Sequence, residues 1–136
     1  MNQNTKTSLL YLCVPPLVAF HQQRFELGCA WYSVGLCSVL NHHRKDYRSR
    51  DRGQHVCFIL DHVALVFAMF MNVKTLWSSG LYLFAALYIE MCLSALSAVN
   101  LSRRMFLIRG VRFEPLLSLV HCVGGVTNLL ILHITH

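Results

Sequence analysis

The sequence has little charge, few prolines and no polar linker. Of its 136 residues, 13% are charged and 55% are hydrophobic, and the mean hydropathy is +0.47. A soluble globular domain usually carries roughly 25% charged residues. The shortage of charge excludes an ordinary water-soluble domain and favours an integral membrane protein. Because no repeat, low-complexity tract or long linker divides the chain, we expect residues 1–136 to form a single transmembrane domain.

Acidic residues are also scarce, and the formal net charge is +6. A basic balance in a soluble protein would suggest nucleic acid as a partner. Here the basic residues cluster in two short stretches between apolar runs, and no basic patch carries the interleaved aromatic residues typical of single-strand binding. We therefore expect no nucleic acid partner. The lipid bilayer is the partner that this charge pattern indicates.

No pair of cysteines forms a CxxC motif. A disulfide framework or a zinc knuckle would place cysteines in polar loops, whereas all six lie within or at the ends of apolar runs. We expect reduced thiols that act as small hydrophobic side chains. The six are Cys13, Cys29, Cys37, Cys57, Cys92 and Cys122.

Five apolar runs predict an all-α, polytopic membrane protein with about five spans. A membrane-spanning helix needs about 20 mostly apolar residues. The second, third and fifth runs meet this length, whereas the fourth is longer and should either tilt strongly or consist of two half-length segments. The runs cover residues 8–20, 25–43, 55–73, 75–101 and 115–133.

The first run is short and contains Pro15 and Pro16. Lys6 followed by "SLLYLCVPPLVAF" also has the shape of a signal peptide. No small-x-small cleavage site follows this stretch, because the chain continues directly into "HQQRF". The pattern therefore favours a retained span that is short or kinked, with the signal peptide as the alternative.

Basic residues are distributed unevenly around the five runs. Five crossings place Lys6 and the basic loops 44–52 and 103–112 on one side, and only Arg24 and Lys74 on the other. The positive-inside rule then puts the N-terminus and both basic loops in the cytosol, or in an organelle matrix, and the C-terminus on the opposite side. If the fourth run formed two full spans, the basic loop 103–112 would lie on the side opposite the other basic residues. The asymmetry therefore favours an odd number of crossings. On this topology the "NLS" sequon at Asn100 should stay unglycosylated.

Four polar residues inside the runs share one expected depth. Ser38 and His42 lie near the end of the second run, Asp61 lies about two turns into the third, and His121 lies within the fifth. Ser38 and His42 are four residues apart and share a helix face. Imidazoles bind zinc, and a carboxylate can position or deprotonate the bound water. His42 and His121 are therefore the candidate metal ligands, and Ser38 and Asp61 are the candidate catalytic residues.

A structural role is the alternative for these residues. Asp61 would then be a buried polar contact, His42 an interfacial residue, and His121 a hydrogen-bond donor to a neighbouring helix. Glu90, within the fourth run, is also expected to make a helix contact. Small residues in the fourth and fifth runs permit close packing within the bundle or against another membrane subunit. They are Ser94, Ala95, Ser97, Ala98, Gly124 and Gly125.

Three segments resemble the myomaker-like family of the CREST superfamily, whose other members include the PAQR receptors and the alkaline ceramidases. "QRFELGCAWYSVGLCSVLNHH" contains the Ser-x-x-x-His of the second span as Ser38 and His42, and "FILDHVALVF" contains the aspartate of the third as Asp61. "LSLVHCVGGVTNLLIL" places His121 at the second histidine of the last span, where Leu117 replaces the first. The family has seven spans. The resemblance therefore implies a shortened, divergent member with at most a degenerate zinc site.

This resemblance implies a role in membrane remodelling or lipid handling. The missing ligand favours a protein without enzymatic activity, and an active member would be a zinc-dependent lipid hydrolase. The alternative is a non-catalytic accessory subunit of a larger membrane complex, such as a respiratory complex. Its partners would then include other membrane protein subunits.

Overall fold

A computed structural model describes residues 3–42, 52–110 and 114–136 of the chain. All regular secondary structure in these ranges is α-helical, which confirms the all-α part of the predicted fold class. The basic loop 44–52, apart from its last residue, and residues 111–113 lie outside the described ranges. The helices are α1 (Gln3–Cys13), α2 (Pro15–His21), α3 (Phe25–His42), α4 (Arg52–Ser78), α5 (Tyr82–Arg109) and α6 (Glu114–Ile134).

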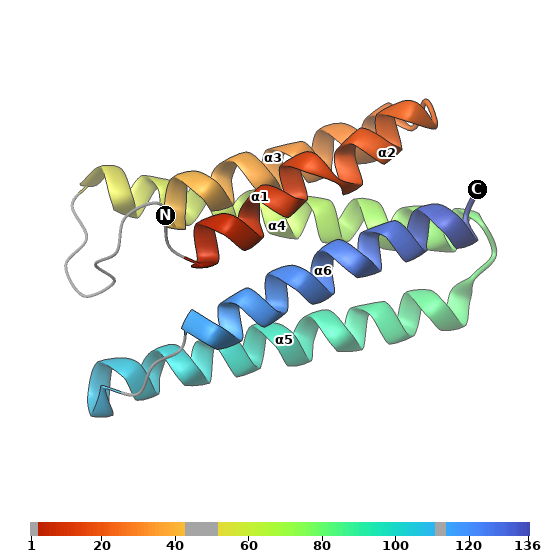
Figure 1. Cartoon of the computed structure of the whole chain (residues 1–136). Helices are drawn as coiled ribbons and strands as arrows, with labels where there is room; N and C mark the ends of the chain where they lie inside the picture. The colour runs from red at the N-terminus through yellow and green to blue at the C-terminus, as the bar shows by residue number, and fades with distance from the viewer. Residues whose placement is uncertain (1–2, 43–51, 111–113) are drawn as a thin grey trace.

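Helices α1 and α2 run end to end in place of the first predicted span (Figure 1). Proline lacks the backbone N–H that an uninterrupted helix would use, so α1 ends at Cys13 and α2 begins at Pro15. The expected kink is therefore present. The helix begins at Gln3 rather than at residue 8, and the polar residues Asn4 and Thr5 in its first part are buried inside the bundle. Hydropathy alone does not detect that first part of the helix.

The boundary between the third and fourth predicted spans was wrong. Helix α4 continues past residue 73 to Ser78, and Lys74 is an exposed residue within it. A lysine can lie in a helix and extend its ammonium group towards water, so it did not mark a turn. The turn follows at Gly80, whose φ of 76° suits glycine. Helix α5 therefore covers Tyr82–Arg109 instead of residues 75–101.

Helix α5 is continuous over 28 residues, so the fourth run is not two half-length segments. It ends at Gly110, whose left-handed conformation is typical of a helix C-terminus. Helices α3 and α6 agree closely with predictions 25–43 and 115–133, although residue 43 lies outside the described ranges.

Three helices of the described chain are long and apolar enough to cross a membrane. They are Val56–Ser78, Tyr82–Arg109 and Pro115–Ile134. The protein is therefore a membrane-embedded helix bundle. At 1.5 Å per residue, α5 is roughly 42 Å long, whereas the hydrocarbon core is about 30 Å thick. The helix must tilt or extend beyond the core, and the basic end that contains Arg103, Arg104 and Arg109 is suited to the membrane surface.

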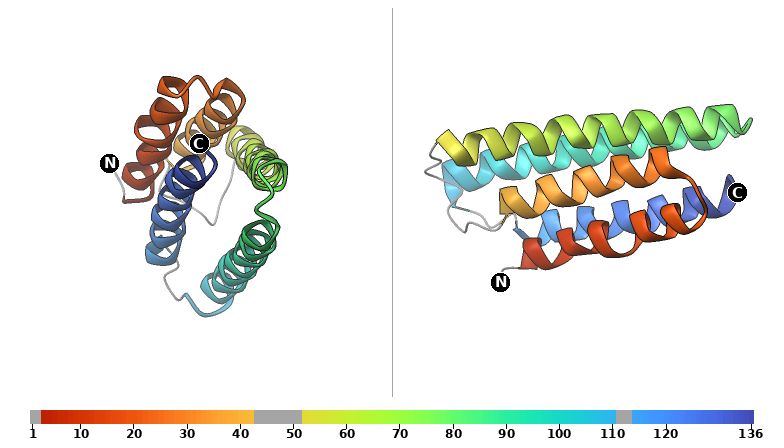
Figure 2. Two further views of the ribbon diagram at one scale, coloured as in Figure 1. Left: turned by 90° about the vertical axis from the view of Figure 1, so that its right-hand side faces the viewer. Right: turned by 90° about the horizontal axis from the view of Figure 1, so that it is seen from above.

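Successive long helices run in alternating directions (Figures 1 and 2). The start of α1, the end of α3, the start of α4, the end of α5 and the start of α6 lie towards one end of the bundle. Helix α3 packs between α1–α2 and α4, and α6 packs mainly against α1. Helix α5 packs mainly along α4 and is the most peripheral helix (Figure 2).

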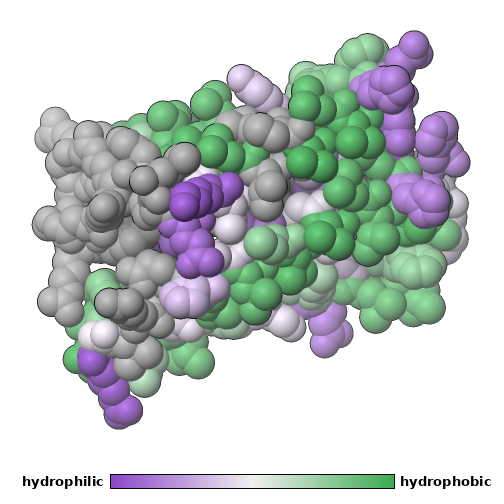
Figure 3. Space-filling model, in the orientation of Figure 1, coloured by the Kyte–Doolittle hydropathy of each residue, from purple (hydrophilic) through white to green (hydrophobic). Residues whose placement is uncertain are grey.

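The main core lies where α2, α3, α4 and α6 meet, and Trp31 is fully buried at its centre. Many large hydrophobic side chains instead cover the outside of α4, α5 and α6, among them Val66, Phe70, Leu83 and Ile108. Figure 3 shows this apolar surface across the middle of one face, with hydrophilic side chains gathered largely towards the ends. Such a surface is suited to contact with lipid.

Arg24, in the turn between α2 and α3, connects that turn to the end of α6. Its guanidinium donates hydrogen bonds to the Leu132 carbonyl at 3.5 Å and to the Thr135 hydroxyl at 2.7 Å. A cation is favourable at a helix C-terminus. Partial burial lowers the pKa of Arg24. This contact fixes α6 against the α2–α3 hairpin at the end opposite the basic loops.

Candidate functional site

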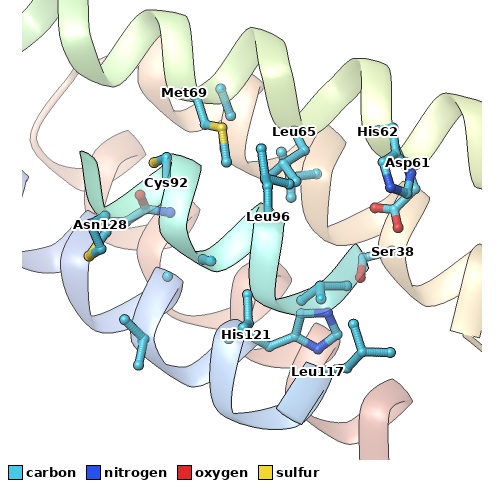
Figure 4. A pocket seen from close by; sticks show the side chains of 18 of the residues that line it. Ser38, Asp61, His62, Leu65, Met69, Cys92, Leu96, Leu117, His121 and Asn128 are labelled. Carbon is cyan, nitrogen blue, oxygen red and sulfur yellow. The ribbon is translucent and has the colours of Figure 1, made fainter. Parts of the chain in front are cut away.

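A cavity of about 140 Å³, partly open at the surface, lies between α3, α4, α5 and α6 (Figure 4). One end is polar and the middle is apolar, with Leu65, Met69, Cys92 and Leu96 among the lining residues. The other end carries Asn72, Tyr88 and Asn128. The polar end contains Ser38, Asn41, His42, Asp61, His62, Arg103 and His121. All four residues proposed from the sequence, Ser38, His42, Asp61 and His121, therefore line one cavity.

Ser38 and His42 share a face of α3, as their spacing predicts, and both are buried. The Ser38 hydroxyl lies 2.8 Å from the Ser8 hydroxyl of α1, and these two groups form a hydrogen bond. The Thr5 hydroxyl donates to the backbone carbonyl of His42 at 3.0 Å. Helix α1 therefore fixes the last turns of α3, and the Ser38 oxygen already has a polar neighbour.

His121 reaches the same region from α6. Its ring centroid lies 5.1 Å from that of His42, with the two planes inclined at 58°. The Nδ1 atom of His121 lies 2.8 Å from the Thr7 hydroxyl of α1, and the tautomer decides which group donates. This contact orients the His121 ring towards α1. The structure thus brings the two candidate histidines together.

Asp61 lies on α4 and is half-buried. Its Oδ2 accepts a hydrogen bond of 2.9 Å from the Asn41 side-chain amide, which holds the carboxyl group against α3. His62 and Arg103 line the same end of the cavity. Arg103 lies over the Phe58 ring, with Cζ 4.6 Å from the ring centroid. Asp61 therefore belongs to a polar cluster shared by α3, α4 and α5.

A complete zinc site is not present among the described residues, where no three His, Cys, Asp or Glu side chains are grouped so that they could hold a metal ion. A catalytic zinc site commonly has three protein ligands. His42 and His121 are neighbours, but Asp61 is engaged by Asn41, and Leu117 lies buried on α6 where the resemblance implies another histidine. The donor set does not fit zinc as a resident cofactor.

The contribution of α1 was missed by the sequence reasoning. Asn4 is buried, and its side-chain oxygen accepts a hydrogen bond of 2.7 Å from the Ser118 hydroxyl of α6. Thr7 bonds His121 and Ser8 bonds Ser38. The signal was the polar i, i+4 pair Asn4 and Ser8 at the start of the apolar run, which indicates one polar helix face.

A second polar network, centred on Asn72, was also missed. The Asn72 side-chain oxygen accepts a hydrogen bond from the Trp31 indole at 2.9 Å. Its amide donates to the Tyr88 hydroxyl at 2.8 Å and to the Asn128 oxygen at 2.9 Å. One asparagine therefore joins α3, α4, α5 and α6. The sequence signal for this network was Asn72 itself, a polar residue within the apolar run 55–73.

Comparison with known proteins adds no relative to this description. No protein-family model matches the chain, and no curated protein or solved structure matches it either. The site itself is therefore the only guide to function.

Proposed function

We propose that this protein handles lipid within the membrane, as a shortened and divergent relative of the myomaker-like CREST proteins. The cavity carries this proposal. Its polar end could bind a lipid headgroup, while Leu65, Met69 and Leu96 offer an apolar wall to a hydrocarbon chain. Binding pockets commonly combine an apolar lining with a few placed polar groups.

The volume limits the size of the ligand. A cavity of about 150 Å³ lined by apolar residues accommodates benzene, and this cavity measures about 140 Å³. It is suited to the headgroup-proximal part of one chain and is too small for a lipid with two enclosed chains. Because the cavity is partly open, the rest of a single chain would remain in the bilayer. The ligand class is thus a single-chain amphiphile.

We assign the protein no hydrolytic activity. Its polar end resembles a degenerate form of the zinc site of the CREST proteins, with Leu117 in place of a ligand. The side chains that remain can bind and orient a headgroup. His42, His121 and Asn41 can exchange hydrogen bonds with it, and Arg103 supplies a positive charge for an anionic group.

The proposal includes five crossings, with α1 and α2 as one kinked span, and basic loops on the cytosolic or matrix side. Arg103, Arg104 and Arg109 gather at one end of α5, whereas Arg24 and Lys74 lie towards the other end of the bundle. The positive-inside rule supports this orientation. It would place the polar end of the cavity in the leaflet nearest the basic loops.

Direct binding tests the proposal. The full chain, purified in detergent, would be incubated with spin-labelled oleic acid, spin-labelled lysophosphatidylcholine or spin-labelled diacyl phosphatidylcholine. We expect immobilisation of one or both single-chain probes at one per chain and none of the diacyl lipid. Ala95→Trp, which places a large side chain in the cavity lining, should abolish immobilisation.

The matched control is Val66→Trp, which adds the same indole to an exposed position of α4. This variant should immobilise the probes as well as the unaltered chain does. Equal binding by the Ala95→Trp and unaltered chains would refute the cavity as a lipid site, as would failure of both single-chain probes to bind.

A second candidate is a non-catalytic accessory subunit of a larger membrane complex. The peripheral position of α5 favours it, because most of the outer surface of this helix is left uncovered by the rest of the chain. Purification in a mild detergent would test this candidate. A stable complex of defined composition would support the subunit function, and a monodisperse single chain would contradict it.

A further inference from the structure

Glu90 of α5 is an exposed carboxylate within a membrane-spanning helix. It lies eight residues after Tyr82, or roughly 12 Å along the helix. In the ranges that the structure describes, no hydrogen bond or ion pair to Glu90 is found. An ionised side chain at such a depth is costly unless it is paired, and residues of this kind usually face protein or water rather than lipid.

Glu90 belongs to a continuous outward-facing stripe along α5. The stripe positions alternate in steps of four and three residues, which places them on one side of a helix. All of them are exposed. The Glu90 stripe consists of Leu83, Leu87, Glu90, Ser94, Ser97, Leu101 and Arg104.

The opposite face of α5 is already occupied. Tyr88, Cys92 and Val99 line the cavity, and Tyr88 bonds Asn72. Because the Glu90 stripe lies away from the cavity, it can bind a partner without changing the lipid site. Its function is therefore separate from the lipid binding proposed above.

The centre of the stripe is built for close helix contact. Ser94 and Ser97 follow Glu90 by one and two turns, and their small side chains let another backbone approach. Serine hydroxyl groups can also form hydrogen bonds across such an interface. A surface that faced only lipid would gain nothing from a carboxylate and two hydroxyls in this arrangement.

The charges of the Glu90 stripe indicate which kind of helix can bind it. A second copy of the chain would have the same orientation, because its basic loops lie on the same side. Symmetric packing of two α5 helices would then place Glu90 against Glu90 and Arg104 against Arg104. A like-charge pair inside the membrane would be destabilising. A helix that places an ammonium or guanidinium group beside Glu90 would instead neutralise the carboxylate.

We propose that the Glu90 stripe binds one membrane-spanning helix of a different protein, which carries a lysine or arginine at the depth of Glu90. The cation pairs with the carboxylate, and Ser94 and Ser97 permit the close approach that this pairing requires. Both charged groups then leave the lipid together.

A synthetic helix tests this proposal directly. The full chain, labelled with a donor fluorophore, would be placed in phosphatidylcholine vesicles with an acceptor-labelled 21-residue helix of leucine and alanine carrying one central lysine. A central lysine lies near the depth of Glu90 in either orientation of the peptide. We expect the lysine peptide to associate about tenfold more tightly than a peptide with leucine at that position.

Two kinds of variant separate charge from shape. Glu90→Gln should reduce the preference for lysine over leucine to about one, and Ser94→Ile should weaken association with the lysine peptide by blocking close approach. The matched control is Glu26→Gln, which removes an exposed carboxylate at the start of α3 and should change nothing.

The same measurement can also contradict the proposal. Equal association of the lysine and leucine peptides would overturn the proposal, and so would a lysine preference that persists in Glu90→Gln. Energy transfer between two labelled copies of the chain, lost in Glu90→Gln, would show that the occupant is a second copy. Because the spin-label assay addresses the cavity alone, failure here leaves the lipid result intact.

Discussion

The imidazole rings of His42 and His121 lie 5.1 Å apart, centroid to centroid, and join the end of α3 to the start of α6. Leu117 lies one helical turn before His121, is only 6% exposed and lines the same cavity. A tetrahedral zinc site needs more donors than these two imidazoles provide. These two imidazoles alone therefore do not make a complete zinc site.

Leu117→His should create a zinc site. The added imidazole would lie one turn from His121 and opposite His42, which gives three nitrogen ligands. We expect at least a tenfold gain in zinc affinity over the unaltered chain, measured by competition with a chromogenic chelator and by metal analysis of the purified protein.

Leu119→His serves as the control, because Leu119 lies on the same helix and is 59% exposed on its outer face. It should leave zinc affinity unchanged. One tightly bound zinc per unaltered chain, lost in both His42→Ala and Asp61→Ala, would contradict the degenerate site and restore the hydrolase hypothesis.

Much of the site could be predicted because depth in a bilayer follows directly from position in an apolar run. Ser38, His42, Asp61 and His121 were expected in one leaflet, and they line one cavity. Helix rotation cannot be obtained from hydropathy. For this reason the sequence did not reveal that Glu90 faces outwards, away from the other helices of the described chain.

The remaining errors also have physical causes. Asn4 and Thr5 form part of the bundle interior, yet their polarity placed them before the first predicted span, which begins at Ser8. Buried polar residues that satisfy one another resemble loop residues in any hydropathy analysis. Lys74 had the same effect at the end of α4, where a single exposed charge suggested a boundary that Gly80 provides.

Asn72→Leu should destabilise the bundle. The substitution removes three hydrogen bonds and leaves the buried Trp31 indole N–H without its acceptor. Interhelical hydrogen bonds in membranes average about 0.6 kcal/mol each, so we expect a loss of about 2 kcal/mol in the free energy of unfolding. Equilibrium unfolding by SDS in mixed micelles, followed by circular dichroism, measures this loss.

Asn100→Leu is the corresponding control, since Asn100 is an exposed amide on α5. Its effect should stay within about 0.5 kcal/mol, as for most surface substitutions. Equal stability of Asn72→Leu and the unaltered chain would show that the four-helix network contributes nothing to stability.

Gly28→Ala should also weaken the bundle, through steric overlap. An added Cβ at this position would lie 2.6 Å from Cε1 and 2.7 Å from Cδ1 of Phe20, where α2 packs against α3. Forcing apart a close-packed contact of this kind typically costs about 1–3 kcal/mol. The double variant Gly28→Ala with Phe20→Ala should show less than the sum of the two single losses.

Gly125→Ala provides the contrast within α6. No heavy atom outside the helix's own local backbone lies within 4 Å of an added Cβ there. Because alanine favours a helix over glycine by up to about 1 kcal/mol, this variant should be neutral or more stable. If Gly28→Ala were as well tolerated as Gly125→Ala, the close approach of α2 and α3 would not be important for stability.

Tags in the basic loop and at the C-terminus test the sidedness of the chain. An epitope tag added after His136 should be labelled by antibody on intact cells if the protein resides in the plasma membrane, or protected inside sealed microsomes if it resides in the endoplasmic reticulum. A tag inserted after Arg48, in the basic loop, should show the opposite accessibility. Three crossings, by α4, α5 and α6, lie between the two tags, and an odd number requires this difference because each crossing transfers the chain to the other side.

Removal of arginines tests whether positive charge determines the orientation of the chain in the membrane. Replacing Arg103, Arg104 and Arg109 with glutamine removes positive charge from one end of α5 and should raise the fraction of inverted chains. The matched change of Arg24 and Lys74 to glutamine removes charge from the opposite side and should strengthen the original orientation.

Tags after Arg48 and His136 that were both accessible from one side would require an even number of crossings between them. Together with α4, α5 and α6 as three complete spans, that result would contradict the topology and place the polar end of the cavity in a different leaflet.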